Sequence, residues 1–237
     1  MRKPAYRLDL GVVPYAEALD LQRSLAAAVL HGAIPDTVVF LEHPRVITVG
    51  RRTGEEELHV PPNAEVEIVE TDRGGKSTYH APGQLVCYPI LDLNLHGRDV
   101  KKYCRDLEEA VIRTLVVHGL DATRIEGLTG VWLERPSRKI CSIGVHVSRW
   151  VTTHGYALNV DLDAVPFTSW ITACGLEDAA FTTMARELGA PLAVEDVRLA
   201  AASALAEVFD LALEPLPAED AAGLWPQPIH EKIGAKV

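Results

Sequence analysis

The sequence lacks a long apolar run and a complete secretory signal. Apolar stretches such as residues 25–30 fall far short of the roughly 20 residues that a helix needs to cross a bilayer. The chain starts with Arg2 and Lys3, as a signal peptide would, but Arg7 and Asp9 interrupt the apolar segment that should follow. We therefore expect a soluble, unexported protein that works in the cytoplasm and does not bind a membrane.

A basic excess is also missing. The 237 residues include 23 Lys and Arg against 33 Asp and Glu, a formal net charge of −10. Nucleic-acid-binding surfaces are normally basic, so this balance argues against a nucleic-acid partner. Basic residues nevertheless gather locally, at Arg51 and Arg52, at Arg73 and Lys76, and at Arg135, Arg138 and Lys139. Such clusters could dock an acidic partner, or they could be solvated charges with no shared role.

Cysteine pairs are absent as well. The four cysteines contain no C-x-x-C pair, and their spacings match no zinc or disulfide framework, so we expect reduced thiols and no metal site. Cys87 and Cys141 fall in apolar strand patterns and Cys104 in a helical one, as small buried residues do. Only Cys174 falls in an irregular segment, next to a glycine, and it is the best candidate nucleophile by position.

Hydrophobic periodicity predicts an α+β protein. Helical patterns cover residues 14–31, 99–118 and 194–209. Strand patterns cover residues 6–12, 37–41, 46–49, 66–69, 84–91, 129–133, 140–147 and 151–160. This order lacks the regular βαβ alternation of a doubly wound sheet, so we expect two layers, a mixed β-sheet packed with helices.

No internal repeat or low-complexity tract divides the chain. Its length suits one sizeable core, so we predict a single domain over residues 1–214. Residues 215–237 are rich in proline and show little periodicity, which predicts a surface-bound tail.

The segment of residues 72–84 concentrates reactive and hydrogen-bonding groups between two predicted strands. Adjacent Gly74 and Gly75 let backbone N–H groups converge on one oxygen. Arg73 could fix a phosphate or a carbonyl, and the residues up to His80 add directional hydrogen bonds. The alternative is a Gly/Pro-rich turn whose polar residues cap themselves. The segment is neither a Walker loop nor a dinucleotide fingerprint, so nucleotide use gains no support.

The segment of residues 130–146 reads as a hairpin whose return strand starts near Lys139. On that strand Lys139 and Cys141 share one face, and Ser142 lies on the other. From the residues alone, a lysine at the start of an apolar strand is most simply a solvated strand end.

Several motifs occur together in the order found in one family. They are Leu41-Glu-His-Pro44 with Val49-Gly-Arg51, Arg73-Gly-Gly-x-x-Thr-Tyr-His-x-Pro-Gly-Gln-Leu-Val-x-Tyr-Pro89, Gly130-Val-Trp132, Lys139-Ile-Cys-Ser-Ile-Gly144, His154-Gly-x-Ala-Leu-Asn-Val160 and Cys174-Gly175. Over residues 6–210 the chain resembles the lipoyl(octanoyl) transferases. The resemblance implies the fold of biotin and lipoate protein ligases. It also implies octanoyl transfer from an acyl carrier protein to a lysine, without ATP or another cofactor.

The resemblance further implies residue roles and partners. Cys174 would be the nucleophile, forming a thioester, and Lys139 its acid/base partner. Around the acyl chain would lie Arg73, Gly74, Gly75, Lys76, Ser77, Thr78, Tyr79, His80, Ser142, Ile143, Gly144, Gly155, Tyr156 and Ala157. Expected partners are octanoyl-acyl carrier protein as donor, and lipoyl domains of 2-oxoacid dehydrogenase complexes and the glycine cleavage H protein as acceptors. His80, His146 and His154 are alternative bases, of which we expect His80 to shape the site and His146 to face solvent.

The chain departs from the family pattern at two positions and leaves three rival functions open. Ala81 replaces a glycine and Ala173 a proline, and neither change removes a reactive group. The rivals are an ATP-dependent lipoate ligase, an amidotransferase that moves octanoyl between lipoyl domains, and a binding module without catalysis.

Overall fold

A central mixed sheet carries the candidate site. The computed structural model describes residues 2–54, 57–134, 137–172, 180–217, 220 and 224. The sheet comprises β12 (Leu211–Pro215), β1 (Lys3–Val12), β2 (Asp36–Glu42), β6 (Gln84–Ile90), β10 (Val151–Asn159), β9 (Arg138–Ser148), β8 (Leu128–Leu133) and β7 (Thr123–Ile125), in that order. Parallel pairs join β1 to β12 and to β2, and β11 (Ala180–Phe181) to β9, while the other neighbours are antiparallel.

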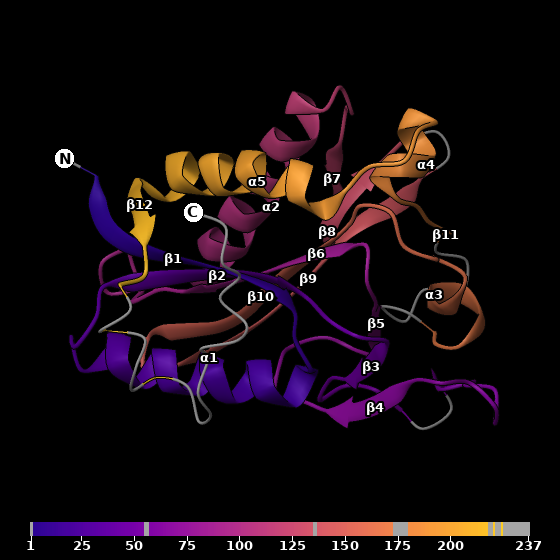
Figure 1. The fold of residues 1–237 in the computed structure, drawn as a ribbon, viewed down its shortest axis with the longest axis horizontal. Coiled ribbons are helices and arrows are strands. Elements are labelled where there is room, and N and C mark those ends of the chain that lie inside the picture. The colour runs from indigo at the N-terminus through magenta and orange to yellow at the C-terminus, as the bar shows by residue number, and fades with distance from the viewer. Residues whose placement is uncertain are drawn as a thin grey trace.

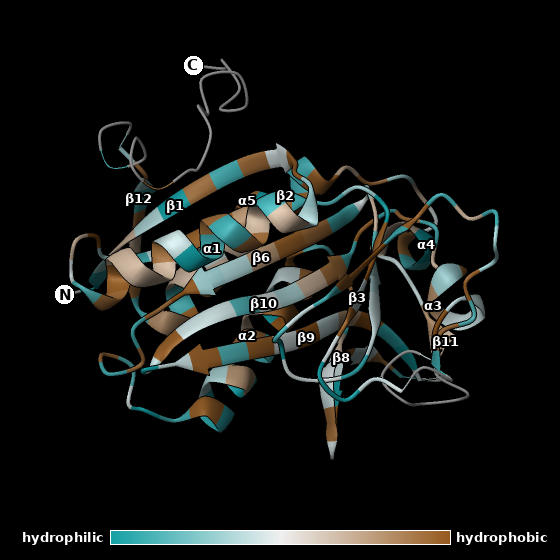
Figure 2. Ribbon diagram, turned by 90° about the horizontal axis from the view of Figure 1, so that it is seen from below, coloured by the Kyte–Doolittle hydropathy of each residue, from teal (hydrophilic) through white to brown (hydrophobic). Residues whose placement is uncertain are grey.

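Helices cover both faces of this sheet. Helix α1 (Tyr15–Leu30) lies on one face, and α2 (Val100–Val117) and α5 (Val194–Phe209) lie on the other (Figure 1; Figure 2). On β2, Val39 and Leu41 pack with α1, whereas Val38 and Phe40 belong to the core beneath α2 and α5. A strand covered on both sides is apolar without interruption, which explains the continuous hydrophobic run of β2. The expected mixed sheet packed with helices is confirmed, with the helices divided between its two faces.

A second, smaller sheet flanks the first. Its order is β4 (Glu67–Glu70), β3 (Val46–Val49) and β5 (Thr78–His80), and it lies near α3 (Pro166–Ser169). An aromatic cluster links them: the rings of Tyr79 and Phe167 meet edge to face at 5.6 Å, and Phe167 stacks on Phe181 at 4.5 Å. This cluster holds β5, and therefore the loop that precedes it, against the rest of the molecule.

The three predicted helices are present, each within about one residue of the expected ends. Strands β5, β7, β11 and β12 and the short helices α3 and α4 (Met184–Leu188) were not predicted. Each is five residues or fewer, too short for a hydrophobic period to stand out. Within the region expected as a tail, Pro215 ends β12, and the next residue, Leu216, donates its N–H to the carbonyl of Arg7. The domain boundary at residue 214 stays a prediction.

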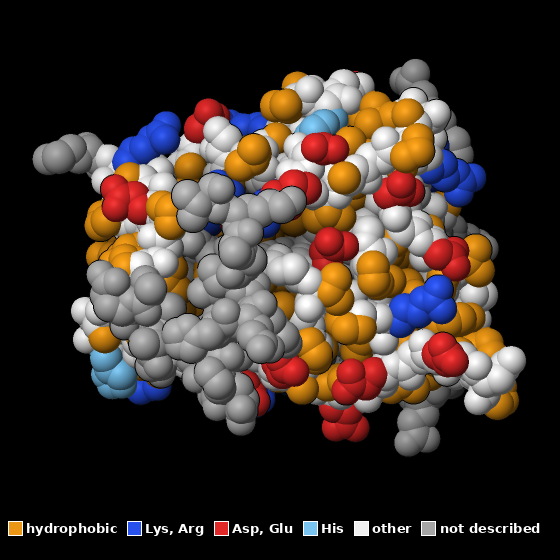
Figure 3. Space-filling view, viewed as in Figure 1, with side chains coloured by type: hydrophobic (Ala, Val, Ile, Leu, Met, Phe, Trp, Pro, Cys, Tyr) orange, Lys and Arg blue, Asp and Glu red, His pale blue; other side chains and the backbone are white. Residues whose placement is uncertain are grey.

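The negative charge is dispersed over the surface. On the face seen in Figure 3, acidic side chains are scattered among apolar and basic ones. Several acidic side chains form ion pairs; for example, Glu187 Oε1 lies 2.9 Å from Arg138 Nε. Among the described residues, no helix is both long and apolar enough to span a membrane.

The packing of α1 predicts a large effect of one truncation. Leu25 is completely buried between α1 and the sheet. We expect Leu25→Ala to lower the free energy of unfolding by about 2–5 kcal/mol, because it leaves a cavity in this core. Urea unfolding followed by circular dichroism measures the loss. Leu199→Ala on α5, where the side chain is 62% exposed, is the control and should change stability by no more than about 0.5 kcal/mol. Equal losses in the two variants would contradict this assignment of the core.

Candidate active site

The glycine loop (residues 71–77) packs directly against β9. Strand β8 pairs with residues 138–141 of β9, and beyond that stretch Gly74 donates its N–H to the carbonyl of Val145 at 3.0 Å. A Cβ on Gly144 would lie 3.1 Å from the carbonyl oxygen of Gly74, so a larger residue would push the loop away. The N–H of Gly74 is therefore committed to β9, which leaves the N–H of Gly75 as the loop's better candidate donor to a substrate oxygen.

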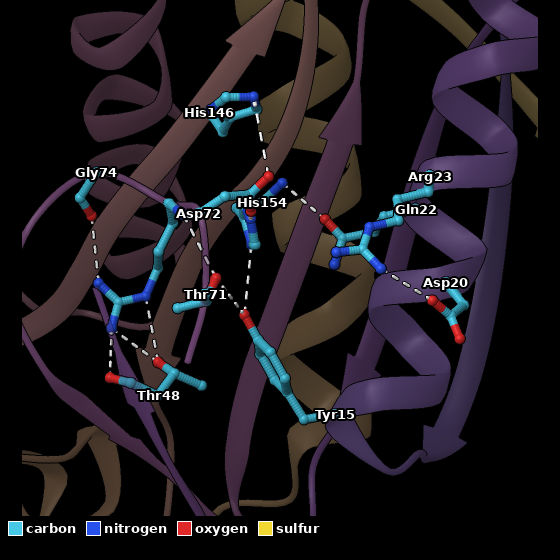
Figure 4. Close-up of polar contacts among 11 residues, drawn as sticks. Tyr15, Asp20, Gln22, Arg23, Thr48, Thr71, Asp72, Gly74, His146 and His154 are labelled. Atoms are coloured by element: carbon cyan, nitrogen blue, oxygen red, sulfur yellow. Dashed lines mark hydrogen bonds and ion pairs between the residues drawn. The ribbon is translucent and has the colours of Figure 1, made fainter. Parts of the chain in front are cut away.

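Arg73 holds the loop in its curled shape. Its buried guanidinium donates to the hydroxyl and the carbonyl of Thr48 at 2.8 and 2.7 Å (Figure 4). It also donates to the carbonyl of Lys76 at 2.6 Å. These acceptors belong to the protein, and the sequence-based suggestion that Arg73 could fix a ligand phosphate or carbonyl stays a prediction. Through these bonds its side chain shapes the loop.

The loop forms one wall of a narrow cavity of about 70 Å³, called here the first cavity. The lining residues are Tyr15, Arg73, Gly74, Gly75, Lys76, Ser77, Thr78, His80, Val86, Tyr88, Lys139, Ser142, Ile143, Gly144, His154, Gly155, Tyr156 and Ala157. Apart from Tyr79, every residue expected around the acyl chain lines this cavity together with Lys139. The structure thus gathers three segments that are distant in the sequence at one place, although their roles remain predictions.

Tyr79 faces away from the first cavity. It lies between Thr78 and His80 on β5, so its side chain points to the opposite side of the strand. There it packs against Phe167, as described above. Ala81, one of the two departures from the family pattern, is buried in the same aromatic cluster and does not line the first cavity.

Lys139 is buried, in contrast to the solvated strand end that the residues alone suggested. Its residue exposure is 3%, and its Nζ lies 5.2 Å from the centre of the Trp132 ring. The Lys139 side chain passes over Gly130, where φ is +122° and a Cβ would lie 2.6 Å from Lys139 Cε. Glycine at position 130 therefore makes room for the lysine side chain.

Cys174 lies outside the described residues, as does Ala173. The described chain on either side is anchored: Thr172 donates its N–H to the carbonyl of Glu57 at 2.9 Å, and Ala180 pairs with Arg138. Phe181 pairs with Lys139 itself, so the chain returns from the Cys174 segment directly beside the candidate base.

The other three cysteines are poor nucleophiles. Burial raises the pKa of the Cys87 thiol well above its ordinary value, and it also raises the pKa of Cys141. Cys104 is half-buried, and its pKa is raised by burial and by the nearby Glu108 carboxylate. At neutral pH these three residues remain protonated thiols, and a thiolate is the reactive form.

A directional chain of hydrogen bonds fixes the protonation of His80. The carbonyl of Thr182 accepts from Asn159 Nδ2 at 3.0 Å, and Asn159 Oδ1 accepts from Gln84 Nε2 at 2.9 Å. Gln84 Oε1 then faces His80 Nδ1 at 2.7 Å, so that nitrogen carries the proton. Burial lowers the pKa of His80 well below its ordinary value, which keeps the ring neutral with its lone pair at Nε2. This geometry agrees with a role in shaping the site.

The Leu41–Pro44 motif supplies a second neutral histidine. His43 Nδ1 donates to the carbonyl of Val13 at 2.7 Å, so Nε2 accepts from the hydroxyl of Tyr88 at 2.7 Å. Burial lowers the pKa of His43 to about 4. Glu42 accepts the N–H of Gly83 at 2.7 Å. The motif therefore positions Tyr88, a wall of the first cavity that sequence reasoning missed.

His154 joins the glycine loop to α1 (Figure 4). Its Nε2 lies 2.8 Å from Asp72 Oδ1, its backbone N–H donates to Gln22 Oε1 at 2.7 Å, and its Nδ1 lies 3.5 Å from the hydroxyl of Tyr15. Burial lowers the pKa of His154. Burial raises the pKa of Asp72, but the hydrogen bond from His154 and the charges of nearby histidines outweigh it, so that pKa is lowered. The pair is thus a carboxylate with a neutral imidazole.

The position of His154 could not be read from strand periodicity. On a regular strand it would share a face with Tyr156, which packs in the core beneath α2 and α5. Instead it contacts α1, and its backbone is left-handed, with φ at +59°. His146, which sequence reasoning placed in solvent, is partly exposed and lies 3.9 Å from Asp72.

The neutral buried histidines predict a loss of stability in acid. Because the folded-state pKa of His43 is about 4 and an unfolded histidine titrates near 6.5, the unfolded chain binds the extra proton between these values. The contribution of His43 is therefore complete above pH 6.5 and falls as the pH drops toward 4. We expect a loss of about 2 kcal/mol by pH 5 from this residue, measured by urea unfolding at pH 7 and pH 5.

His43→Asn should make the stability less dependent on pH. His31→Asn, at the exposed end of α1, should retain the wild-type dependence. An unchanged pH dependence in His43→Asn would contradict the assignment.

Comparison with known proteins identifies the family. The family model for the lipoyl protein ligase A/B catalytic domain matches residues 14–206. An octanoyltransferase of Chloroflexus aurantiacus is 48% identical over 212 residues, covering 87% of this chain and 93% of the relative.

Among solved structures, lipoate-protein ligase A bound with ATP aligns with a TM-score of 0.77 at 16% identity, covering 94% of this chain and 92% of that one. The biotin protein ligase of Aquifex aeolicus in complex with biotin and ATP aligns with a TM-score of 0.52 at 14% identity, covering 87% and 70%. These two likenesses confirm the expected fold. The chain belongs to the lipoyl protein ligase A/B catalytic-domain family and, within it, to the octanoyltransferases, which are acyltransferases.

Proposed function

We propose that this enzyme moves an octanoyl group from an acyl carrier protein to a lysine of a lipoyl domain, through a thioester on Cys174. Octanoyl transfer in lipoate biosynthesis follows from membership of the octanoyltransferases. The observation that carries the finer proposal is the burial of Lys139 in the wall of a narrow cavity, next to the strand to which the chain returns from Cys174.

The first half-reaction acylates the enzyme. The Cys174 sulfur attacks the carbonyl carbon of the octanoyl thioester, and Lys139 takes the thiol proton. The bond between that carbon and the donor sulfur breaks, and the departing thiolate receives the proton from Lys139. The oxyanion formed on the way needs N–H donors, for which we assign Gly75 and the backbone of Ile143 and Gly144.

The second half-reaction transfers the acyl group. The amine of the acceptor lysine attacks the same carbon after Lys139 has taken one of its protons. The bond to Cys174 breaks, the electron pair stays on sulfur, and the thiolate takes the second proton that the amine nitrogen loses. The products are an amide and the free enzyme. The donor is already a thioester, so the proposal requires no ATP.

The first cavity suits the octanoyl tail. Val86, Ile143 and Ala157 supply apolar wall, and the histidines that line it are neutral and hydrogen-bonded within the protein. Each methylene buried there contributes about 0.8 kcal/mol, so affinity rises steadily with chain length until the cavity is filled.

The proposed partners complete the reaction. The donor is octanoyl-acyl carrier protein, and the acceptors are lipoyl domains of 2-oxoacid dehydrogenase complexes and the glycine cleavage H protein, met in the cytoplasm.

Two related activities give different results in one assay. An ATP-dependent ligase would act on free octanoate only with ATP. An amidotransferase would accept octanoyl from a lipoyl domain.

The nucleophile is tested by intact-mass measurement after incubation with octanoyl-acyl carrier protein. We expect one octanoyl adduct on the wild type and none on Cys174→Ala, because the other three cysteines of the enzyme stay protonated. Cys87→Ala, altered in the buried core, is the matched thiol control and should keep the adduct. An adduct of normal yield on Cys174→Ala would eliminate the proposed nucleophile.

The base is tested separately by the rate of adduct formation. Lys139→Ala should slow acylation at pH 7 by about 10²–10⁴-fold, the usual effect of losing a positioned acid/base group, with an unchanged circular dichroism spectrum. Arg138→Ala, on the same strand but paired with Glu187, is the control and should react within about threefold of the wild type. Normal turnover of Lys139→Ala would refute the role of Lys139.

A further inference from the structure

A second cavity of about 380 Å³ adjoins the first. The two share six lining residues: Gly74, Gly75, Lys76, Lys139, Ile143 and Gly144. Beyond these, the first cavity is lined from the side of α1, by Tyr15 for example, and the second from α2 and β8, by Cys104 and Trp132. Helices α1 and α2 cover opposite faces of the sheet (Figure 1), so the cavities approach Lys139 from different sides.

The second cavity is cationic. Its described lining contains Arg52, Lys76 and Lys139 and no carboxylate. Lys76 is paired with Glu57, a residue outside this lining, and Arg52 is exposed. In a protein of net charge −10 this local balance is unusual. It disfavours an ammonium group as the occupant and favours a ligand that carries negative charge.

One lining residue, Trp132, carries a hydrogen-bond donor, its indole N–H, without a partner among the described residues. Trp132 is 2% exposed. A buried donor of this kind normally finds a partner. Thr129 adds a hydroxyl to the same lining. Cation and neutral donors together fit a ligand that has both amide carbonyls and an anionic group.

We propose that the second cavity receives the phosphopantetheine arm of the acyl donor. This inference rests on the proposed function, in which the donor is a carrier-bound thioester. The acyl tail occupies the first cavity and the arm the second, so that the reacting carbon lies at Lys139, where the cavities meet. An amide carbonyl of the arm accepts from Trp132, and the phosphodiester lies toward Arg52.

The arrangement also provides a path for the leaving group. When the bond between the acyl carbon and the donor sulfur breaks, the electron pair stays on that sulfur, which takes the proton held by Lys139. The arm then leaves through the second cavity as a thiol, and the octanoyl group stays on the enzyme in the first cavity.

The test compares two donors of the same acyl group. One is the octanoyl thioester of free phosphopantetheine, which has the arm without the carrier protein. The other is S-ethyl octanethioate, which has no arm. The second-order rate constant for acylation is measured for each by quenched-flow and intact mass, and their ratio reports what the arm contributes.

Two variants alter the second cavity in different ways. Thr129→Trp fills it, and Arg52→Glu reverses the charge near the expected phosphate. Each variant should lower the ratio of the two rate constants at least about tenfold. Arg52→Glu removes a charge-assisted contact and Thr129→Trp removes space, and both losses slow only the donor that has the arm. Arg51→Glu, which makes the same charge change at an exposed neighbour outside the lining, is the control and should keep the wild-type ratio.

The outcomes separate the inference from the proposed function. Normal acylation by S-ethyl octanethioate shows that a variant is folded and that its reactive groups are intact. An unchanged ratio in both Thr129→Trp and Arg52→Glu overturns the arm site. If the ratio is unchanged while transfer to a lipoyl domain slows, the second cavity binds the acceptor and the arm site is overturned. If the wild type forms no adduct with any donor, the proposed function itself fails.

Discussion

The packing of the glycine loop onto β9 determines the geometry of the whole site. A backbone hydrogen bond from Gly74 to Val145 joins the loop to this strand beyond the stretch where β8 pairs with it. The loop then forms a wall shared by both cavities, with Lys139 in the lining of each. Because Gly144 has no side chain, the loop and the strand approach within backbone contact, and a Cβ at this position would require the loop to shift.

The polar groups around the first cavity are arranged to stay uncharged or fully paired. His43 and His80 are buried and neutral, and the backbone carbonyls of Val13 and Thr182 ultimately set their tautomers. Arg73 donates to protein oxygens. An apolar chain can therefore lie beside these residues without leaving a charge unsolvated, which would be costly. This explains how a cavity with so many polar residues can suit an octanoyl tail.

Much of the fold followed from hydrophobic periodicity, because the long elements repeat it often enough. Helix α5 was predicted at its observed ends, and β10 within one residue of its ends. The short elements were not found, since β5 and β11 have three residues or fewer and are held by the aromatic cluster around Phe167. The site was anticipated largely from the resemblance to a family, whereas the residues alone favoured a solvated position for Lys139.

By itself the sequence determined the layers of the fold and which segments carry reactive groups, because periodicity and motif order are properties of the chain. Only the tertiary structure decided which side chains face one another. His154 has a left-handed backbone, and its side chain lies on the α1 side of the sheet. Gly130 leaves space for the side chain of Lys139 to lie across β8. Tyr15 reaches the first cavity from a segment without a distinguishing motif, and Tyr88 lies in a motif that did not by itself mark it as a lining residue. Such contacts depend on how distant strands pack, which no local pattern encodes.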